Sequence, residues 1–365
     1  MSRRPVLCIL LWILTITFIM TPSGVSPESF FRQVLPGYEY AFPRDHFSHP
    51  DFQTEWWYYT GHLRTEEGKT YGYELTFFRT GIESQRKRES PSAWVMRDVY
   101  FAHLALSDEN KREFRFWEKL NRKGPGLAGA EEGRLLVWNE GWRIEGVNGA
   151  HRLLAAEAGF GIDLLLTPLK PLVIHGEEGI SRKSLEPGHA SHYYSLTRIR
   201  TKGSITVSGT RYDVSGQSWM DHEFFSHMLA EDQEGWDWFS IQLDNDREIM
   251  LYQLRLTGGA IDPVSSGTII GPEGEARHLT FAEFSITPLS SWKSARSGAK
   301  YPAEWEVSIP GQGIRLRVRP TFPDQELKTR QTTYWEGNCT ISGTFQGEEV
   351  SGVGYAELTG YAASL

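Results

Sequence analysis

The densest group of residues that could carry chemistry lies between residues 188 and 227. It contains Gly188-His-Ala-Ser-His192-Tyr-Tyr194 and, further along, Trp219-Met-Asp221-His222. If residues 219–222 form a strand, Trp219 and Asp221 point to one face and His222 to the other. An aspartate held among aromatic side chains is desolvated, which raises its pKa and makes it a better proton donor. Asp221 is therefore a candidate general acid, and the alternative is that it pairs with a neighbouring turn or histidine in a structural network.

The same stretch partly matches two other catalytic motifs. His222-Glu223 followed by His227 resembles a zinc-protease motif, but the second histidine falls at i+5, so the two do not share one helix face. Gly216-Gln-Ser218 resembles a nucleophile elbow without its closing glycine. The zinc-protease reading fails, and a serine hydrolase stays open as an alternative.

A second polar and aromatic group lies near the start of the chain. It contains Asp45-His46-Phe-Ser-His49 and Glu55-Trp56-Trp57. His46 and His49 have a spacing that could serve a metal ion, but no third ligand can be named from the sequence. The alternative is that they form hydrogen bonds at the rim of a barrel. We predict neither a resident metal nor a cofactor.

Composition excludes several function classes. The 365 residues carry a formal net charge of −8 and no sizeable basic block, so nucleic acid is a poor partner. Two cysteines cannot build a disulfide framework. An apolar fraction of 39% provides a packed core.

The N-terminus has the three parts of a secretory signal. Arg3-Arg4 precede an apolar run over residues 6–20, and a stretch of small residues and prolines follows. We predict a signal peptide over residues 1–26 and a secreted or periplasmic protein. The alternative is an uncleaved segment that holds the protein to the membrane.

The elements that must position these residues are β-strands. From Tyr38 onward, short aromatic or β-branched runs recur every 8–15 residues or so, separated by turn residues, which favours an all-β sandwich or barrel. Two internal echoes suggest a duplication. Trp56–Leu63 resembles Trp236–Leu243, and the stretch from Ser208 to Asp221 resembles the stretch from Ser342 to Glu357. We predict two consecutive antiparallel β domains, residues 37–230 and residues 231–365.

The motifs resemble those of the secreted AttH-type, carotenoid 1,2-hydratase-like (hydroxyneurosporene synthase-like) family of lipocalin-like proteins. The resemblance rests on Pro43–His46, Thr54–His62, His192-Tyr-Tyr194 and Gly216–Phe225, and it extends over about residues 35–365. It implies two lipocalin-like β domains, in agreement with the internal echoes. Small barrels of this kind often hold one apolar ligand.

The resemblance also implies a chemistry. Hydratases of this family protonate an isoprenoid double bond, and water captures the carbocation. Their pattern of histidine-x-aromatic followed by aromatic-x-aspartate is similar to His192-x-Tyr194 and Trp219-x-Asp221, although the order of the two aromatic residue types is reversed. The resemblance implies Asp221 as the acid, His192 as its partner, and Tyr194 and Trp219 as pocket walls.

The sequence therefore predicts an exported, monomeric protein that binds a lipophilic small molecule, with acid-catalysed hydratase chemistry at Asp221. We expect Trp56, Trp57 and His222 to contribute to the ligand site. An envelope ABC-type transport system is the expected protein partner. The alternative function is a secreted hydrolase that acts on a lipophilic or ester substrate.

Overall fold

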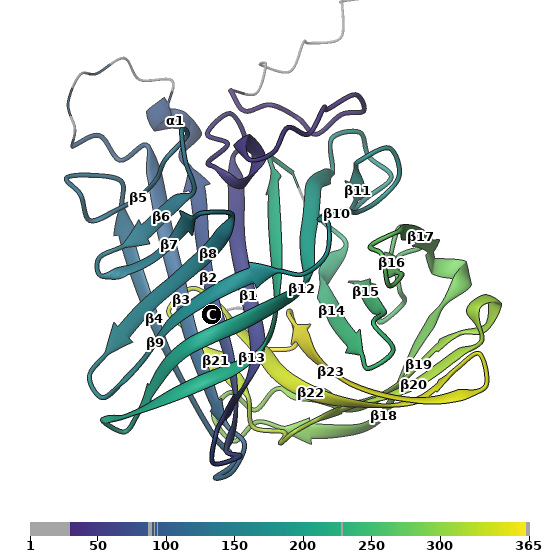
Figure 1. Ribbon diagram of the computed structural model, residues 1–365. Helices are drawn as coiled ribbons and strands as arrows, with labels where there is room; N and C mark the ends of the chain where they lie inside the picture. The colour runs from purple at the N-terminus through teal and green to yellow at the C-terminus, as the bar shows by residue number, and fades with distance from the viewer. Residues whose placement is uncertain (1–29, 87–89, 91, 93, 228, 363–365) are drawn as a thin grey trace, which may run out of the picture.

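The computed structural model describes residues 30–86, 90, 92, 94–227 and 229–362, which fold almost entirely into β-strands (Figure 1). The predicted all-β class with two lipocalin-like units is confirmed. The predicted leader, residues 1–26, lies outside the described residues. Within the described part of the chain, no helix is long and apolar enough to span a membrane.

The first sheet contains thirteen antiparallel strands among the described residues, with the main order β4-β3-β2-β1-β13-β12-β9-β8-β7-β6-β5. Its strands are β1 (Thr54–Thr65), β2 (Thr70–Gly81), β3 (Asp98–Asp108), β4 (Glu113–Arg122), β5 (Ala128–Ala130), β6 (Leu136–Asn139), β7 (Trp142–Val147), β8 (Ala150–Glu157), β9 (Phe160–Pro168), β10 (Val173–Ile174), β11 (Ser181–Arg182), β12 (Ala190–Val207) and β13 (Thr210–Phe225). The short helices η1 (Arg44–His46) and α1 (Glu83–Arg86) accompany it.

In the part of the chain that the structure describes, the second sheet contains ten antiparallel strands, with the main order β17-β16-β15-β14-β23-β22-β20-β19-β18. Its strands are β14 (Gln233–Leu243), β15 (Glu248–Leu256), β16 (Ser266–Ile270), β17 (Ala276–Thr280), β18 (Ser285–Lys293), β19 (Lys300–Ile309), β20 (Ile314–Pro320), β21 (Glu326–Lys328), β22 (Thr333–Phe345) and β23 (Glu348–Leu358). The short helices η2 (Phe281–Glu283) and η3 (Pro310–Gln312) connect strands in this half.

One strand arrangement occurs in both halves. The first long strand of each half pairs with its hairpin partner and with the last strand, so β1 lies between β2 and β13 while β14 lies between β15 and β23. These strands are the segments that echo one another in the sequence. The echo therefore corresponds to equivalent positions in the two sheets.

Each sheet curls around an apolar core of its own (Figure 1). The alternation of side chains explains why, as in β20, where Ile314, Leu316 and Val318 are buried while the arginines between them are exposed. Trp57 and Tyr59 of β1 point into the core of the first sheet. The interior of the first unit is therefore filled by side chains.

A third apolar cluster joins the two sheets. It combines Tyr58, Tyr193 and Trp219 of the first sheet with Trp238 and Tyr252 of the second. All five side chains are buried. The two sheets are thus packed against each other, and this junction contains the candidate site.

Candidate functional site

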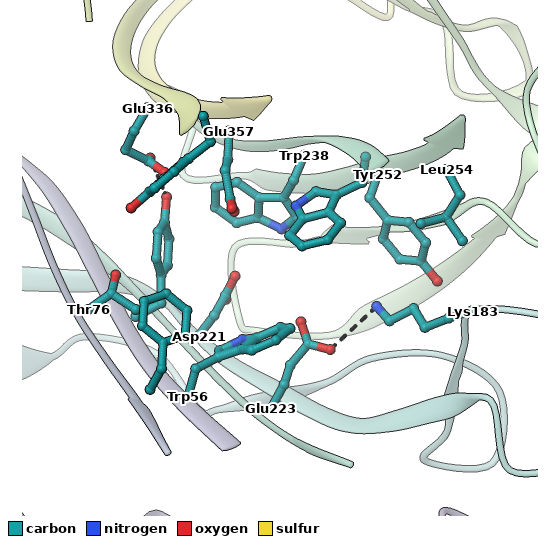
Figure 2. A pocket seen from close by; sticks show the side chains of 14 residues that line it. Trp56, Thr76, Lys183, Asp221, Glu223, Trp238, Tyr252, Leu254, Glu336 and Glu357 are labelled. Atoms are coloured by element: carbon teal, nitrogen blue, oxygen red, sulfur yellow. Dashed lines mark hydrogen bonds and ion pairs between the residues drawn. The ribbon is translucent and has the colours of Figure 1, made fainter. Parts of the chain in front are cut away.

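A pocket of about 690 Å³ lies between the two sheets (Figure 2). Strands β1, β2 and β13 and the segment after β11 line one side, and strands β14, β15, β22 and β23 line the other. The lining residues are Trp56, Tyr58, Thr76, Phe78, Lys183, Asp221, Glu223, Trp236, Trp238, Tyr252, Leu254, Tyr334, Glu336 and Glu357.

Alternation along the strands selects which residues reach the pocket. In β13, Asp221 and Glu223 point toward the second sheet, and His222 between them points into the first unit. In β1, Trp56 and Tyr58 face the pocket, whereas Trp57 does not. The sequence prediction that Trp219 and Asp221 share a face opposite His222 agrees with this arrangement.

Asp221 is held by three donors on its own sheet. Tyr193 donates to Oδ2 at 2.7 Å, Trp219 Nε1 donates to Oδ1 at 2.6 Å, and Ser195 also donates to Oδ1. The residue is only 4% exposed. Burial raises the pKa of Asp221 to about 7, against the opposing effect of the three hydrogen bonds. A carboxyl that is partly protonated at neutral pH therefore lines the pocket.

Two further carboxyls, those of Glu336 and Glu357, line the same pocket from the second sheet (Figure 2). Burial raises the pKa of Glu357 to about 8 and that of Glu336 well above its ordinary range. Tyr58 donates to Glu336 Oε1 at 2.6 Å across the junction. The acids keep protons because the aromatic walls exclude the water that would solvate their charges.

One cation lies at the other end of the pocket. The Lys183 ammonium is 3.4 Å from Glu223 Oε2 and lies over the Tyr252 ring, 4.2 Å from its centroid. Although burial opposes it, Glu223 and Tyr252 raise the pKa of Lys183. The pocket is therefore polar and charged near Lys183, and acidic but largely uncharged around Glu336 and Glu357.

An outer cleft of about 1540 Å³ adjoins the pocket. Phe78, Trp236, Tyr334 and Glu357 line both spaces. The cleft continues along Leu229, the start of β22 and residues 359–362. A ligand chain longer than the pocket could therefore extend along this cleft.

His192 and Tyr194 do not lie in this pocket, and this corrects the predicted pairing with Asp221. Their side chains pack inside the first unit, where His192 contacts the Tyr38 ring and Tyr194 Oη lies 2.8 Å from His222 Nδ1. The residues of β12 opposite Asp221 and Glu223 are Ser195 and Tyr193. Trp57 and His222 likewise face away from the pocket.

A bulge in β12 is the physical reason. Near the turn, Ile199 pairs with Ser218, and the same register continued would place Leu196 opposite Asp221. The register shifts by one residue between Leu196 and Ile199. Because side chains alternate, that shift turns His192 and Tyr194 away from the pocket and brings Tyr193 and Ser195 to it.

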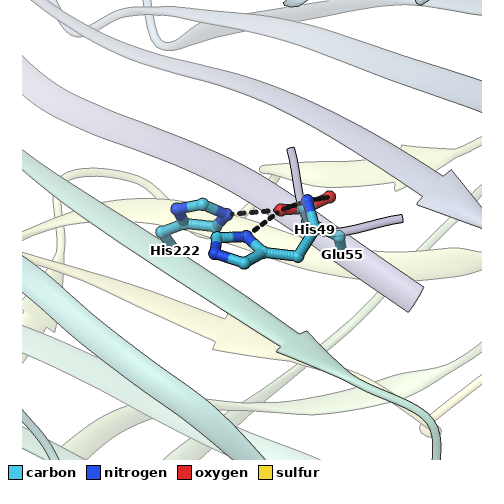
Figure 3. Close-up of side chains that lie close together, drawn as sticks. All are labelled: His49, Glu55 and His222. Atoms are coloured by element: carbon cyan, nitrogen blue, oxygen red, sulfur yellow. Dashed lines mark hydrogen bonds and ion pairs between the residues drawn. The ribbon is translucent and has the colours of Figure 1, made fainter. Parts of the chain in front are cut away.

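His222 belongs to a separate buried cluster with His49 and Glu55 (Figure 3). His49 Nδ1 lies 2.8 Å and His222 Nε2 lies 3.0 Å from Glu55 Oε1. Their ligand-type atoms lie within 4.8 Å of one another, so Glu55 and His222 lie beside His49, whereas the sequence spacing had paired His49 with His46 and named no third ligand. His46 is not part of this group, because its Nδ1 bonds Tyr194 Oη at 2.7 Å.

The cluster is satisfied as an ion network. Arg79 Nε donates to Glu55 Oε2 at 3.1 Å, and His49 Nε2 lies 3.2 Å from Asp45 Oδ1. Although burial opposes it, Asp45 and Glu55 raise the pKa of His49. Arg79 and His49, whose protonated form is favoured here, are thus ion-pair partners for the two carboxylates within the protein.

Comparisons with known proteins agree with the fold. The profile of the AttH-like family matches residues 33–361. The chain belongs to the AttH-like family. The crystal structure of a protein assigned as AttH from Nitrosomonas europaea superposes with a TM-score of 0.82 and 33% identity, over 91% of this chain and all of that one.

This AttH-like chain is also similar to kievitone hydratases. The enzyme from Fusarium solani subsp. phaseoli is 24% identical over 181 residues, a stretch that spans 46% of this chain and about half (49%) of the relative. The kievitone hydratase structure from Nectria haematococca shares the fold, with a TM-score of 0.69 and 16% identity over 94% of this chain and 97% of that one.

Several pocket residues were not singled out from the sequence of this AttH-like protein. Glu357 occupies the position in β23 that Asp221 occupies in β13, and Trp238 corresponds to Tyr58. The internal echo already aligned these positions, so it could have identified both. No pattern in the sequence marked Lys183 or Glu336.

Proposed function

We propose that this AttH-like protein binds a lipophilic molecule between its two sheets and that Asp221 donates a proton to it. The observation that carries this proposal is a desolvated carboxyl, with its pKa near 7, at the wall of an aromatic pocket. Such a group is poised between its acid and base forms at neutral pH, which general acid catalysis requires.

The reaction class is hydration of an isolated carbon–carbon double bond. The π electrons take the proton of Asp221 and form a new C–H bond, which leaves a carbocation on the neighbouring carbon. The faces of Trp56 and Trp238 can stabilise that cation. A water oxygen then bonds to the cation and releases one proton, which returns to the Asp221 carboxylate. The ligand gains one water and the protein is unchanged.

The similarity to kievitone hydratases supports this class, because those relatives are named for a hydration. A serine hydrolase has less support. Ser218 lies inside β13 with its hydroxyl bonded to Tyr73 Oη and Thr201 Oγ1, both at 2.6 Å, and is not at a strand-to-helix turn.

Asp221→Asn tests the proposal. Native mass spectrometry of the gently purified protein first identifies the co-purified molecule, and turnover is measured as gain of one water, traced with labelled water. We expect Asp221→Asn to keep ligand binding and to lose turnover by about 10²–10⁴-fold, because the amide cannot give up a proton.

Asp213→Asn is the matched control, since Asp213 is an exposed aspartate of the same strand. Equal turnover in all three proteins would contradict the role of Asp221. Purified protein that carries no lipophilic molecule and binds none would contradict the proposal as a whole.

We also propose that the chain is exported. The support is the basic, apolar and small-residue succession of the first 26 residues. Mass spectrometry of the native protein should find an N-terminus within a few residues of position 26. A full-length chain in the cytoplasmic fraction would contradict export.

A further inference from the structure

A chain of hydrogen bonds leads away from Asp221 on the side opposite the pocket. Ser195 Oγ donates to Asp221 Oδ1, His175 Nε2 lies 2.7 Å from Ser195 Oγ, and His175 Nδ1 lies 2.8 Å from Thr268 Oγ1. Ser195, His175 and Thr268 are all at most 2% exposed. The chain therefore links the acid of the first sheet to strand β16 of the second through buried groups alone.

When Asp221 is ionised, the direction of every bond in this chain follows from chemistry. A carboxylate only accepts, so the Ser195 hydroxyl donates to Asp221. Ser195 Oγ then accepts from His175 Nε2–H, and His175 Nδ1 accepts from the Thr268 hydroxyl. Burial, with Lys183 and His278 adding to it, lowers the pKa of His175 to about 3, so the ring is neutral as this order requires. All three donors point toward Asp221.

The same order argues against a nucleophilic serine. A serine activated by histidine donates its proton to the ring, whereas Ser195 accepts from His175. The contacts fit proton transfer instead of nucleophilic attack. A row of aligned donors can pass a proton without net movement of any heavy atom.

A second hollow, of about 450 Å³, lies one residue beyond the outer end of the chain. Thr268 lies directly opposite His278 in the β16–β17 pair, and His278 lines that hollow together with Gly176, the residue after His175. Exposed residues, among them Glu177 and Arg182, form part of its lining. Thr268 does not itself line the hollow, but its cross-strand neighbour His278 does, so the chain ends one residue from a space lined in part by exposed residues.

We propose that Thr268, His175 and Ser195 form a proton relay between the outer hollow and Asp221, and this proposal rests on the proposed function. A hydronium ion that reaches Thr268 from the side of the hollow gives one proton to Thr268 Oγ1 and becomes water, as the Thr268 hydroxyl proton moves to His175 Nδ1. The Nε2 proton passes to Ser195, and the Ser195 proton passes to Asp221. One proton enters, one reaches the carboxylate, and His175 ends with its ring proton on Nδ1.

The relay answers a problem that the pocket creates. Hydration returns a proton to Asp221 only after the double bond has taken one, so a carboxylate that is ionised when a lipophile fills the pocket needs another source for its first proton. The other titratable groups around Asp221 all lie inside the same junction. They are Tyr58, Lys183, Tyr193, Glu223, Tyr252, Tyr334, Glu336 and Glu357. The relay leads from the Asp221 carboxyl itself toward the second hollow.

A rapid pH jump tests the relay without any substrate. The full chain is mixed from about pH 8 to about pH 6, across the pKa of Asp221, while tryptophan fluorescence is recorded. Trp219 Nε1 is bonded to the carboxyl and should report its protonation. The same jump on Asp221→Asn identifies the part of the signal that belongs to Asp221.

The informative variants are His175→Gln, which keeps hydrogen-bonding groups but cannot exchange ring protons, and Thr268→Val, which keeps the shape. We expect the equilibrium midpoint to stay within about half a pH unit in both, and the rate to fall about tenfold or more. Thr201→Val is the control, because Thr201 is a buried residue of the same strand as Ser195 and its hydroxyl bonds Ser218 Oγ at 2.6 Å, outside the chain, the pocket and the hollow.

The outcomes separate the relay from the acid. A transition assigned to Asp221 with unchanged rates in His175→Gln and Thr268→Val overturns the relay and leaves the proposed acid intact. The same holds if Thr201→Val slows the transition as much as they do. A wild-type protein without an Asp221 transition near neutral pH overturns both.

Discussion

Asp221 and Glu55 are buried carboxyls of neighbouring strands, yet the pKa of Asp221 is raised and that of Glu55 is lowered. Both side chains are almost completely buried. Asp221 receives hydrogen bonds from neutral groups only, so desolvation dominates and its pKa rises to about 7. Glu55 is also desolvated, but His222, His49 and Arg79 hold its pKa well below the ordinary range. The first carboxyl is suited to donate a proton, and the second is a fixed charge that ties the N-terminal segment to β1 and β2.

The raised pKa of Asp221 predicts a pH effect on stability. Between its ordinary pKa near 4 and its folded value of about 7, the unfolded chain has released the proton and the folded chain still holds it. Stability therefore falls as pH rises through this window, by up to about 4 kcal/mol for this group. We expect Asp221→Asn to remove this share of the decline.

Urea unfolding at a series of pH values measures the effect as the difference between wild type and Asp221→Asn. The difference in free energy of unfolding between the two proteins should change most steeply between about pH 4 and about pH 7 and should stay constant above about pH 7. Parallel curves across the window would show that Asp221 ionises in the folded protein as it does in water.

At the level of elements, the bulge in β12 limits what the sequence could reveal. Strand periodicity correctly separated Asp221 from His222, because that inference needs only one strand. The match of His192 and Tyr194 to Asp221 needs the register of two strands, and the single extra residue between Leu196 and Ile199 reverses it. The residue types between Leu196 and Ile199 do not predict a change of register.

The same bulge directs Arg198 into the second sheet. Its guanidinium bonds Glu248 Oε1 and the Leu243 carbonyl oxygen, the latter at 2.8 Å. Lys170 Nζ is the other cation on Glu248, 2.9 Å from Oε2. The bulge thus provides a buried ion pair between the sheets as well as the face reversal.

Arg198→Ala should lower the free energy of unfolding by about 3 kcal/mol, because it leaves the buried Glu248 with one cation instead of two. Chemical denaturation measures the change. Arg200→Ala is the matched control, since Arg200 is an exposed arginine of the same strand, and it should cost less than about 0.5 kcal/mol. Equal losses of unfolding free energy in both variants would mean that the buried contact of Arg198 with Glu248 does not stabilise the fold.

At the level of the whole molecule, the duplication was predictable and the position of the pocket was not. Repeated motifs indicated two similar β units, and residues of both echoes line the pocket. A cavity inside one barrel was the natural expectation, yet Trp57 and Tyr59 fill the first interior. The pocket arises from the docking of two sheets, and a pattern that is local in sequence carries no information on how distant faces meet.

The junction should also couple the unfolding of the two halves, with Trp238 as a central contact. Its ring packs edge-on against Tyr58 at 5.3 Å and against Trp219 at 6.3 Å between centroids, and its Nε1 donates to Tyr193 Oη at 3.0 Å. Trp238→Ala removes these contacts and leaves a cavity, at a cost of about 3–5 kcal/mol.

We expect wild type to unfold in one calorimetric transition and Trp238→Ala to unfold in two, because each half keeps its own core when the junction weakens. Trp94→Ala removes a tryptophan that is 66% exposed and should leave the single transition unchanged. Ligand binding should be lost in Trp238→Ala alone, since both sheets supply the pocket walls. A single transition that only moves to lower temperature would mean that contacts elsewhere along the junction suffice to couple the halves.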